Sequence, residues 1–140
     1  MASSRPQLSN AARPTTYEVE AYNERDEMVP TAIAGEHPLT LYLDKREIVT
    51  LMTLGHAPEA LALGYLRNQR LAGSIEEIAS VQVDWETGSV AVTTRKGVKG
   101  LKEKMKKRTV TTGCGQGTVF GDLMEEVDRI RLREDVRLAD

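Results

Sequence analysis

Cysteine is scarce in this chain of 140 residues. Cys114 is its only cysteine, which excludes an internal disulfide and a cysteine-based zinc cluster. The two histidines, His37 and His56, lack the helical spacing of a ligand pair. Segment 56–59 reads His-x-x-Glu rather than the His-x-Glu of zinc deaminases. We therefore predict no metal site and expect the reducing cytoplasm as the location.

Long apolar runs and aromatic clusters are also missing. No run approaches the roughly 20 residues that a membrane-spanning helix needs. The polar segment 1–14 lacks the apolar centre of a secretory signal, so we expect no membrane contact. There is no Gly-x-Ser-x-Gly motif, and the scattered carboxylates suggest no acid/base pair. These absences exclude the common hydrolase arrangements.

The composition that remains is that of one globular domain. Hydrophobic residues make up 40% and charged residues 29% of the chain, and the formal net charge is −2. The charge is unevenly distributed, because Arg95–Arg108 holds eight basic residues and one acidic residue, Glu103. This basic segment points to an anionic partner or ligand at one place.

Hydrophobic periodicity predicts a mixed α/β domain with a mixed sheet. Residues 1–16 are expected to be a flexible N-terminal segment, 17–130 the domain, and 131–140 a charged tail. Strands are predicted at 17–22, 39–43, 48–52, 78–85, 90–94 and 110–112, and helices at 59–69, 98–107 and 119–130. Helix 59–69 carries no charge at its centre on any face, which predicts burial between two layers. Gly64 would permit close packing there.

Cys114 is the leading candidate for chemistry. It follows a predicted strand and precedes the helix 119–130, and both a helix N-terminus and nearby cations lower a thiol pKa. The flanking loop residues Gly113, Gly115, Gln116 and Gly117 would support the thiolate and leave room for another molecule. Three alternatives stay open: an inert buried thiol, a phosphate-cradling loop, and a plain strand-to-helix turn.

The basic segment provides a second candidate site. Five of its residues are proposed for docking an anion or a partner protein: Lys102, Lys104, Lys106, Lys107 and Arg108. The ordinary alternative is a solvated charged face. Nucleic acid is a disfavoured partner, because no aromatic residue interleaves these cations for base stacking.

A series of blocks resembles the formate dehydrogenase accessory sulfurtransferases, the FdhD/NarQ family. The blocks follow the family's order: Pro38–Leu43, Leu51–Thr53, Ala60–Leu66, Gly100–Glu103 and Thr111–Gly115. The resemblance implies a fold related to cytidine deaminases without their zinc site. It also implies that Cys114 carries persulfide sulfur from a cysteine desulfurase to a molybdenum or tungsten bis-molybdopterin guanine dinucleotide. That transient cofactor would be destined for formate dehydrogenase, and family members act as dimers.

Two departures from the family pattern affect these expectations. Many members have Cys-x-x-Cys, but Gly117 occupies the second position here, so Cys114 would act alone. Family members are also substantially longer, so the chain resembles their N-terminal half. A homodimer or a complementing chain would then cover its exposed apolar surface. The alternative function is a truncated, non-catalytic remnant that docks a desulfurase or a dehydrogenase.

Overall fold

The computed structural model of the chain describes residues 4–108, 127 and 129–136. The elements of this part are β1 (Gln7–Leu8), β2 (Thr16–Tyr22), β3 (Met28–Ala34), β4 (His37–Leu43), β5 (Arg46–Thr53), α1 (Pro58–Asn68), η1 (Ile75–Glu77), β6 (Ile78–Asp84), β7 (Ser89–Thr94) and α2 (Leu101–Lys106). The predicted mixed α/β class is confirmed.

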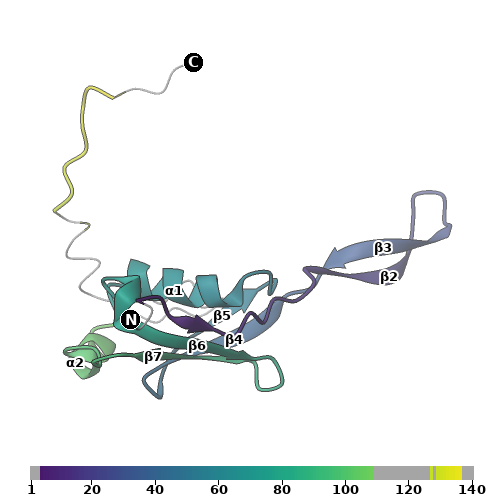
Figure 1. The fold of residues 1–140 in the computed structure, drawn as a ribbon. Helices are drawn as coiled ribbons and strands as arrows, with labels where there is room; N and C mark the ends of the chain where they lie inside the picture. Colours follow the sequence, from purple (N-terminus) through teal and green to yellow (C-terminus); the bar gives the residue numbers. More distant parts are fainter. Residues whose placement is uncertain (1–3, 109–126, 128, 137–140) are drawn as a thin grey trace.

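Five strands form one mixed sheet in the order β1-β6-β7-β4-β5, with α1 lying across one face (Figure 1). Neighbouring strands are antiparallel except at β1–β6 and β4–β7, which are parallel. We call this sheet, together with α1 and α2, the body. None of the helices in the described ranges is long and apolar enough to cross a bilayer.

The two predicted hairpins of the body are both confirmed. In β4, Leu39, Leu41 and Leu43 are fully buried, because alternate side chains of a strand point to the same face. Asp44 and Lys45 form the turn to β5 with φ angles of 46° and 69°, the positive values of the two-residue turns that match strand twist. The second hairpin joins β6 and β7.

The core lies between the sheet and one side of α1. Ala62 and Leu66 of α1 are fully buried and belong to the same apolar cluster as the leucines of β4. The prediction that α1 is buried between two layers was wrong: Ala60 and Gly64 are exposed, and a Cβ on Gly64 would meet no described atom within 4 Å. Among the described residues, the sheet covers one side of the helix and nothing packs closely against Gly64.

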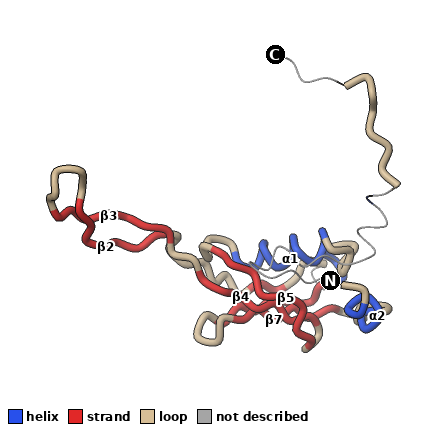
Figure 2. Tube along the Cα trace, turned by 180° about the vertical axis from the view of Figure 1, so that it is seen from behind, coloured by secondary structure: helices blue, strands red, loops and turns tan. Residues whose placement is uncertain are grey.

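A second, two-stranded sheet forms outside the body. Strands β2 and β3 pair antiparallel over seven residues each, from Thr16 opposite Ala34 to Tyr22 opposite Met28. This hairpin, which we call the arm, projects from the body at the end opposite α2 in both views (Figures 1 and 2). Strand β2 was predicted, but β3 was not, because Pro30 interrupts it and Pro lacks the N–H of a strand residue.

The N-terminal segment differs from the expected flexible lead-in. Its strand β1 pairs with β6 through Gln7 opposite Ser80 and Leu8 opposite Val81. The backbone N–H of Arg13 donates to the carbonyl oxygen of Gly55 at 2.8 Å. The segment is therefore bonded to the body, through partners that are distant in sequence.

The predicted helix 98–107 is shorter than expected. Gly97 and Gly100 have φ angles of 77° and 65°, which an α-helix does not accept, so α2 begins only at Leu101. The predicted strand 110–112 and most of the predicted helix 119–130 lie outside the described residues. Residues 131–136 of the predicted charged tail are exposed and form neither helix nor strand.

Candidate functional site

The thiol loop predicted from the sequence lies outside the described residues. This applies to Cys114 and to its neighbours Gly113, Gly115, Gln116 and Gly117. Their roles therefore stay predictions. The structure describes the residues before this loop, up to Arg108.

Arg108 ends the described stretch before the loop, six residues before Cys114. Its guanidinium Nη1 donates to the carbonyl oxygen of Ile48 in β5 at 3.0 Å and lies 3.8 Å from the sulfur of Met105. Arg108 also acts on Tyr65 of α1: burial raises the pKa of the Tyr65 phenol to about 12, and the nearby positive charge opposes that rise. Arg108 is thus half-buried and links α2 to β5.

The cations of the basic segment are of two kinds. Some donate hydrogen bonds to backbone carbonyl oxygens, and the others are exposed. Lys104 Nζ donates to the carbonyl oxygen of Arg70 at 2.9 Å, and Arg95 Nε donates to that of Glu76 at 2.9 Å. Lys104 and Arg108 of the proposed docking set make such bonds, and the docking role of the whole set stays a prediction. Lysines that stay exposed are Lys96, Lys99, Lys102, Lys106 and Lys107, which we call the lysine surface.

Within the lysine surface, one lysine has an acidic neighbour. Lys106 Nζ lies 3.6 Å from a carboxylate oxygen of Glu103, and both side chains are more than half exposed. Such a pair contributes little because water and salt screen it. The surface therefore keeps a strong positive potential.

A hollow of about 370 Å³ lies beside this surface. It is lined by Arg46 and Lys102, by the open backbone at Gly97 and Gly100, and by Asp44, Val98 and Leu101. The Asp44 carboxylate accepts bonds from the backbone N–H of Thr94 at 2.9 Å and from its hydroxyl at 2.6 Å. These bonds hold Asp44 against the end of β7. The hollow is therefore lined by two cations and one carboxylate, with a net charge of one positive unit.

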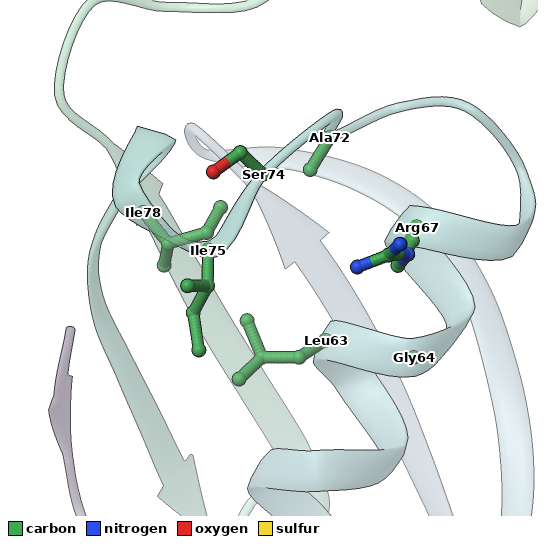
Figure 3. Close-up of a pocket in the computed structure, with 7 residues that line it drawn as sticks. All are labelled: Leu63, Gly64, Arg67, Ala72, Ser74, Ile75 and Ile78. Atoms are coloured by element: carbon green, nitrogen blue, oxygen red, sulfur yellow. The ribbon is translucent and has the colours of Figure 1, made fainter. Parts of the chain in front are cut away.

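A second cavity, of about 160 Å³, lies between α1 and η1 (Figure 3). Its walls are mostly apolar, and Arg67 is the charged residue among them. Figure 3 shows Arg67 and Leu63 reaching from α1 toward the side of the cavity that holds Ile75 and Ile78. The lining residues include the Ser74 hydroxyl but no Cys, His, Asp or Glu, so they offer no acid/base pair for chemistry.

A buried carboxylate holds the N-terminal segment on the body. Glu59, in the first turn of α1, is 7% exposed and accepts bonds from the Ser9 hydroxyl at 2.8 Å and the Ala11 N–H at 2.6 Å. Burial raises its pKa, but the bonds from Ala11 and Ser9 outweigh burial, so the Glu59 pKa is lowered overall. Ser9 in turn accepts a bond from the N–H of Val83 at 2.9 Å.

An aromatic cluster continues this attachment. Trp85 Nε1 donates to the carbonyl oxygen of Ala11 at 2.6 Å, and the Arg13 guanidinium lies 5.2 Å from the Trp85 ring centre. His37 packs against the same ring with the centroids 5.8 Å apart. Gly55 completes the contact, because a Cβ there would approach Trp85 and Arg13 to 3.3 Å.

Sequence reasoning missed this cluster, although Pro58-Glu59 at a helix start was a signal for a carboxylate near the positive helix end. The other histidine, His56, is exposed. No group of three or more His, Cys, Asp or Glu side chains that could hold a metal ion occurs in the described ranges.

The amino-acid sequence matches a protein-family model and several curated proteins. The model of the "FdhD/NarQ family" matches residues 34–140. The "Sulfur carrier protein FdhD" of Wolinella succinogenes is 31% identical over 97 residues, covering 69% of this chain and 34% of that protein. The protein of the same name from Listeria monocytogenes is 28% identical over 88 residues, covering 63% of this chain and 34% of the relative.

A solved structure supports the fold. The crystal structure of a protein from Desulfotalea psychrophila, described as a formate dehydrogenase accessory protein, matches with a TM-score of 0.51 and 21% identity. The match covers 71% of this chain and 44% of the solved one. The chain spans about a third of the length of the curated relatives from Wolinella and Listeria. The expected relation to cytidine deaminases stays a prediction.

Proposed function

This chain belongs to the FdhD/NarQ family, and from that premise we propose that it carries sulfur on Cys114 for the maturation of formate dehydrogenase. The observation that carries the proposal is the position of its only cysteine. Cys114 lies inside the matched residues 34–140, and the relatives from Wolinella and Listeria are named sulfur carrier proteins. A carrier that holds sulfur on a thiol of this chain has no other residue to use.

The loading step is a persulfide transfer from a cysteine desulfurase. The Cys114 thiolate attacks the outer sulfur of the desulfurase persulfide. A new S–S bond forms on Cys114, the S–S bond on the desulfurase breaks, and the desulfurase cysteine leaves as a thiolate. No external oxidant is needed. The cations that precede Cys114 in sequence, Lys106 to Arg108, support the thiolate form.

Delivery is the second half of the proposal. The substrate that accepts the sulfur is the molybdenum or tungsten bis-molybdopterin guanine dinucleotide of formate dehydrogenase. Its pyrophosphates are anionic, and the hollow lined by Arg46, Lys102 and Asp44 has a net positive charge that suits them. A cytoplasmic location is part of the same proposal.

Cyanide tests the loading step, because it removes sulfane sulfur as thiocyanate, which is measured by colour. The chain is incubated with a cysteine desulfurase and cysteine, separated from the desulfurase, and treated with cyanide. We expect about one thiocyanate per chain and none from Cys114→Ser, which keeps the size of the side chain but lacks the thiol. Equal thiocyanate from both would contradict the proposal.

A second candidate function is a docking module without sulfur chemistry. The exposed cations of the lysine surface favour it, since they complement an acidic face of a desulfurase or dehydrogenase. Binding measured by titration calorimetry separates the two functions. A docking module keeps its affinity in Cys114→Ala and loses it in Lys102→Ala/Lys107→Ala, whereas the carrier function ends in Cys114→Ala.

A further inference from the structure

The cavity between α1 and η1 has room for one small apolar group. Its volume is about 160 Å³, and its apolar walls come from Leu63, Ala72, Ile75 and Ile78 (Figure 3). An engineered apolar cavity of about 150 Å³ in another protein stays dry and binds benzene. The volume and the walls of this cavity therefore suit a group of about the size of a six-carbon ring.

A single cation lies beside these apolar walls. Arg67 extends from α1 toward the cavity, and its side chain is exposed (Figure 3). Across the residues that the structure describes, no ion pair uses the Arg67 guanidinium. A guanidinium binds a carboxylate through two parallel N–H···O bonds. Arg67 therefore offers an anion-binding group next to a site for an apolar group.

The cavity is also accessible. Gly64 is exposed and lines the cavity, and a Cβ at this position would meet no described atom within 4 Å. Ile75, on the η1 side, is 49% exposed. Because the removal of apolar surface from water is favourable, a group that covers Ile75 gains binding energy there.

The surroundings favour a small ligand over an extended acidic segment of a protein. A neighbouring hollow of about 390 Å³ shares Ser74 with the cavity. The charged residues of that hollow balance each other: Glu76, Glu77, Arg95 and Lys96. The Ser74 hydroxyl itself donates to the Glu76 carboxylate. Selection for negative charge is therefore confined to Arg67, within reach of a small molecule in the cavity.

We propose that this cavity binds a small carboxylic acid whose apolar part is about the size of a six-carbon ring. The apolar part lies against Leu63, Ile75 and Ile78, and the carboxylate pairs with Arg67. Binding involves no covalent step. This inference goes beyond the sulfur-carrier proposal and does not depend on Cys114, which is not among the lining residues.

Nuclear magnetic resonance of the whole chain tests the proposal with 3-phenylpropionate as the probe. The amide signals of Gly64 and Ile75 are followed as the probe is added at neutral pH. We expect saturable shifts with a dissociation constant in the millimolar range, as the size of the probe allows. The neutral 3-phenylpropanamide should bind about two- to fivefold more weakly, because it lacks the charge. Propionate, which lacks the ring, should bind at least about tenfold more weakly.

Two variants separate the apolar and the charged part of the site. Arg67→Gln should abolish the preference for the acid over the amide, and Arg25→Gln, the same exchange at an exposed residue of the arm, should keep it. Ile75→Asp places a carboxylate in the apolar wall and should weaken binding of 3-phenylpropionate at least about tenfold. Its control is Leu132→Asp, at a residue that is 84% exposed and does not line the cavity.

The outcomes that overturn the proposal are distinct. The first is an absence of shifts at Gly64 and Ile75 with millimolar 3-phenylpropionate. The second is equal binding of the acid and the amide by the wild type, and the third is an unchanged preference in Arg67→Gln. Binding of the peptide acetyl-Gly-Gly-Phe without binding of the free acid would assign the cavity to a protein chain end and overturn the proposal as well. Cys114→Ser should bind 3-phenylpropionate like the wild type, so failure of sulfur loading leaves this test unaffected.

Discussion

Leu39, Leu41 and Leu43 in the body are fully buried, whereas Tyr17, Tyr22 and Met28 in the arm keep more than half of their surface exposed. Both regions are antiparallel hairpins; the arm keeps one register along its length, and the body hairpin β4–β5 shifts register between Leu41 and Tyr42. The body hairpin packs its apolar face against α1, and the arm has no such layer in the described residues. Strand pairing alone therefore does not distinguish a hairpin that forms a core from one that stays exposed.

The difference also concerns charge. In the body, the buried carboxylate of Glu59 accepts two hydrogen bonds, and Arg108 donates to a backbone carbonyl oxygen. The arm leaves its acids in water. Buried polar groups are costly when unpaired, and exposed ones are not. The body thus pairs the polar groups that it buries, whereas the arm keeps its charges exposed.

The largest expected effect comes from the body core. Leu41→Ala removes a fully buried side chain and leaves a cavity between β4 and α1, so the free energy of unfolding should fall by about 2–5 kcal/mol. Urea denaturation measures it. The matched control is Leu54→Ala, at a residue that is 40% exposed. A loss below about 1 kcal/mol at Leu41 would remove the contrast between the two regions.

A smaller effect is expected at the buried carboxylate. Glu59→Gln should lower the free energy of unfolding at neutral pH by about 1–3 kcal/mol, because the Ala11 N–H and the Ser9 hydroxyl lose a charged acceptor. The arm provides the control, since Glu18→Gln changes an exposed acid and should have an effect below about 0.5 kcal/mol.

The pH dependence of this effect has a fixed sign. The folded-state pKa of Glu59 is lowered from 4.5, so its contribution is fully present above that pH and is lost as the pH falls through the lowered pKa. The difference between wild type and Glu59→Gln should therefore shrink in acid. Urea denaturation across this range measures it, and a difference that grows in acid would contradict the bonding pattern described for Glu59.

The smallest effect is expected from removing most of the arm. Replacing residues 19–31 with an Asn-Gly turn joins Glu18 to Ala32, which face each other in the hairpin. The free energy of unfolding of the monomeric body should change by less than about 0.5 kcal/mol, since the arm buries no core residue. Thermal unfolding at high salt measures it. A large loss would show that the arm supports the body.

The sequence predicted the body better than the arm for a physical reason. Alternation at Leu39, Leu41 and Leu43 and the Pro58 helix start are local signals, and the structure confirms both elements. Strand β3 lacks such a pattern because Pro30 interrupts it. The N-terminal attachment depends on bonds such as Ser9 to Glu59, between residues 50 positions apart, which no local pattern reveals.

The candidate site shows the same limit. Residue types and glycine flanks were enough to select Cys114, and the charge run was enough to select the basic segment. The sequence could not predict which cations of the basic segment bind carbonyl oxygens and which are exposed lysines. Lys104 and Arg108 bind carbonyl oxygens 34 and 60 positions away, and only the fold brings these groups together.

Intact-mass spectrometry of the chain after incubation with a cysteine desulfurase and cysteine tests the central claim most directly. The account predicts a gain of one sulfur atom on the wild type, removed by a reducing agent and absent from Cys114→Ala. It also predicts the same gain on the arm-shortened variant, because sulfur loading belongs to Cys114 and not to the arm. No gain on the wild type, with the same desulfurase loading a full-length FdhD relative, would contradict the account.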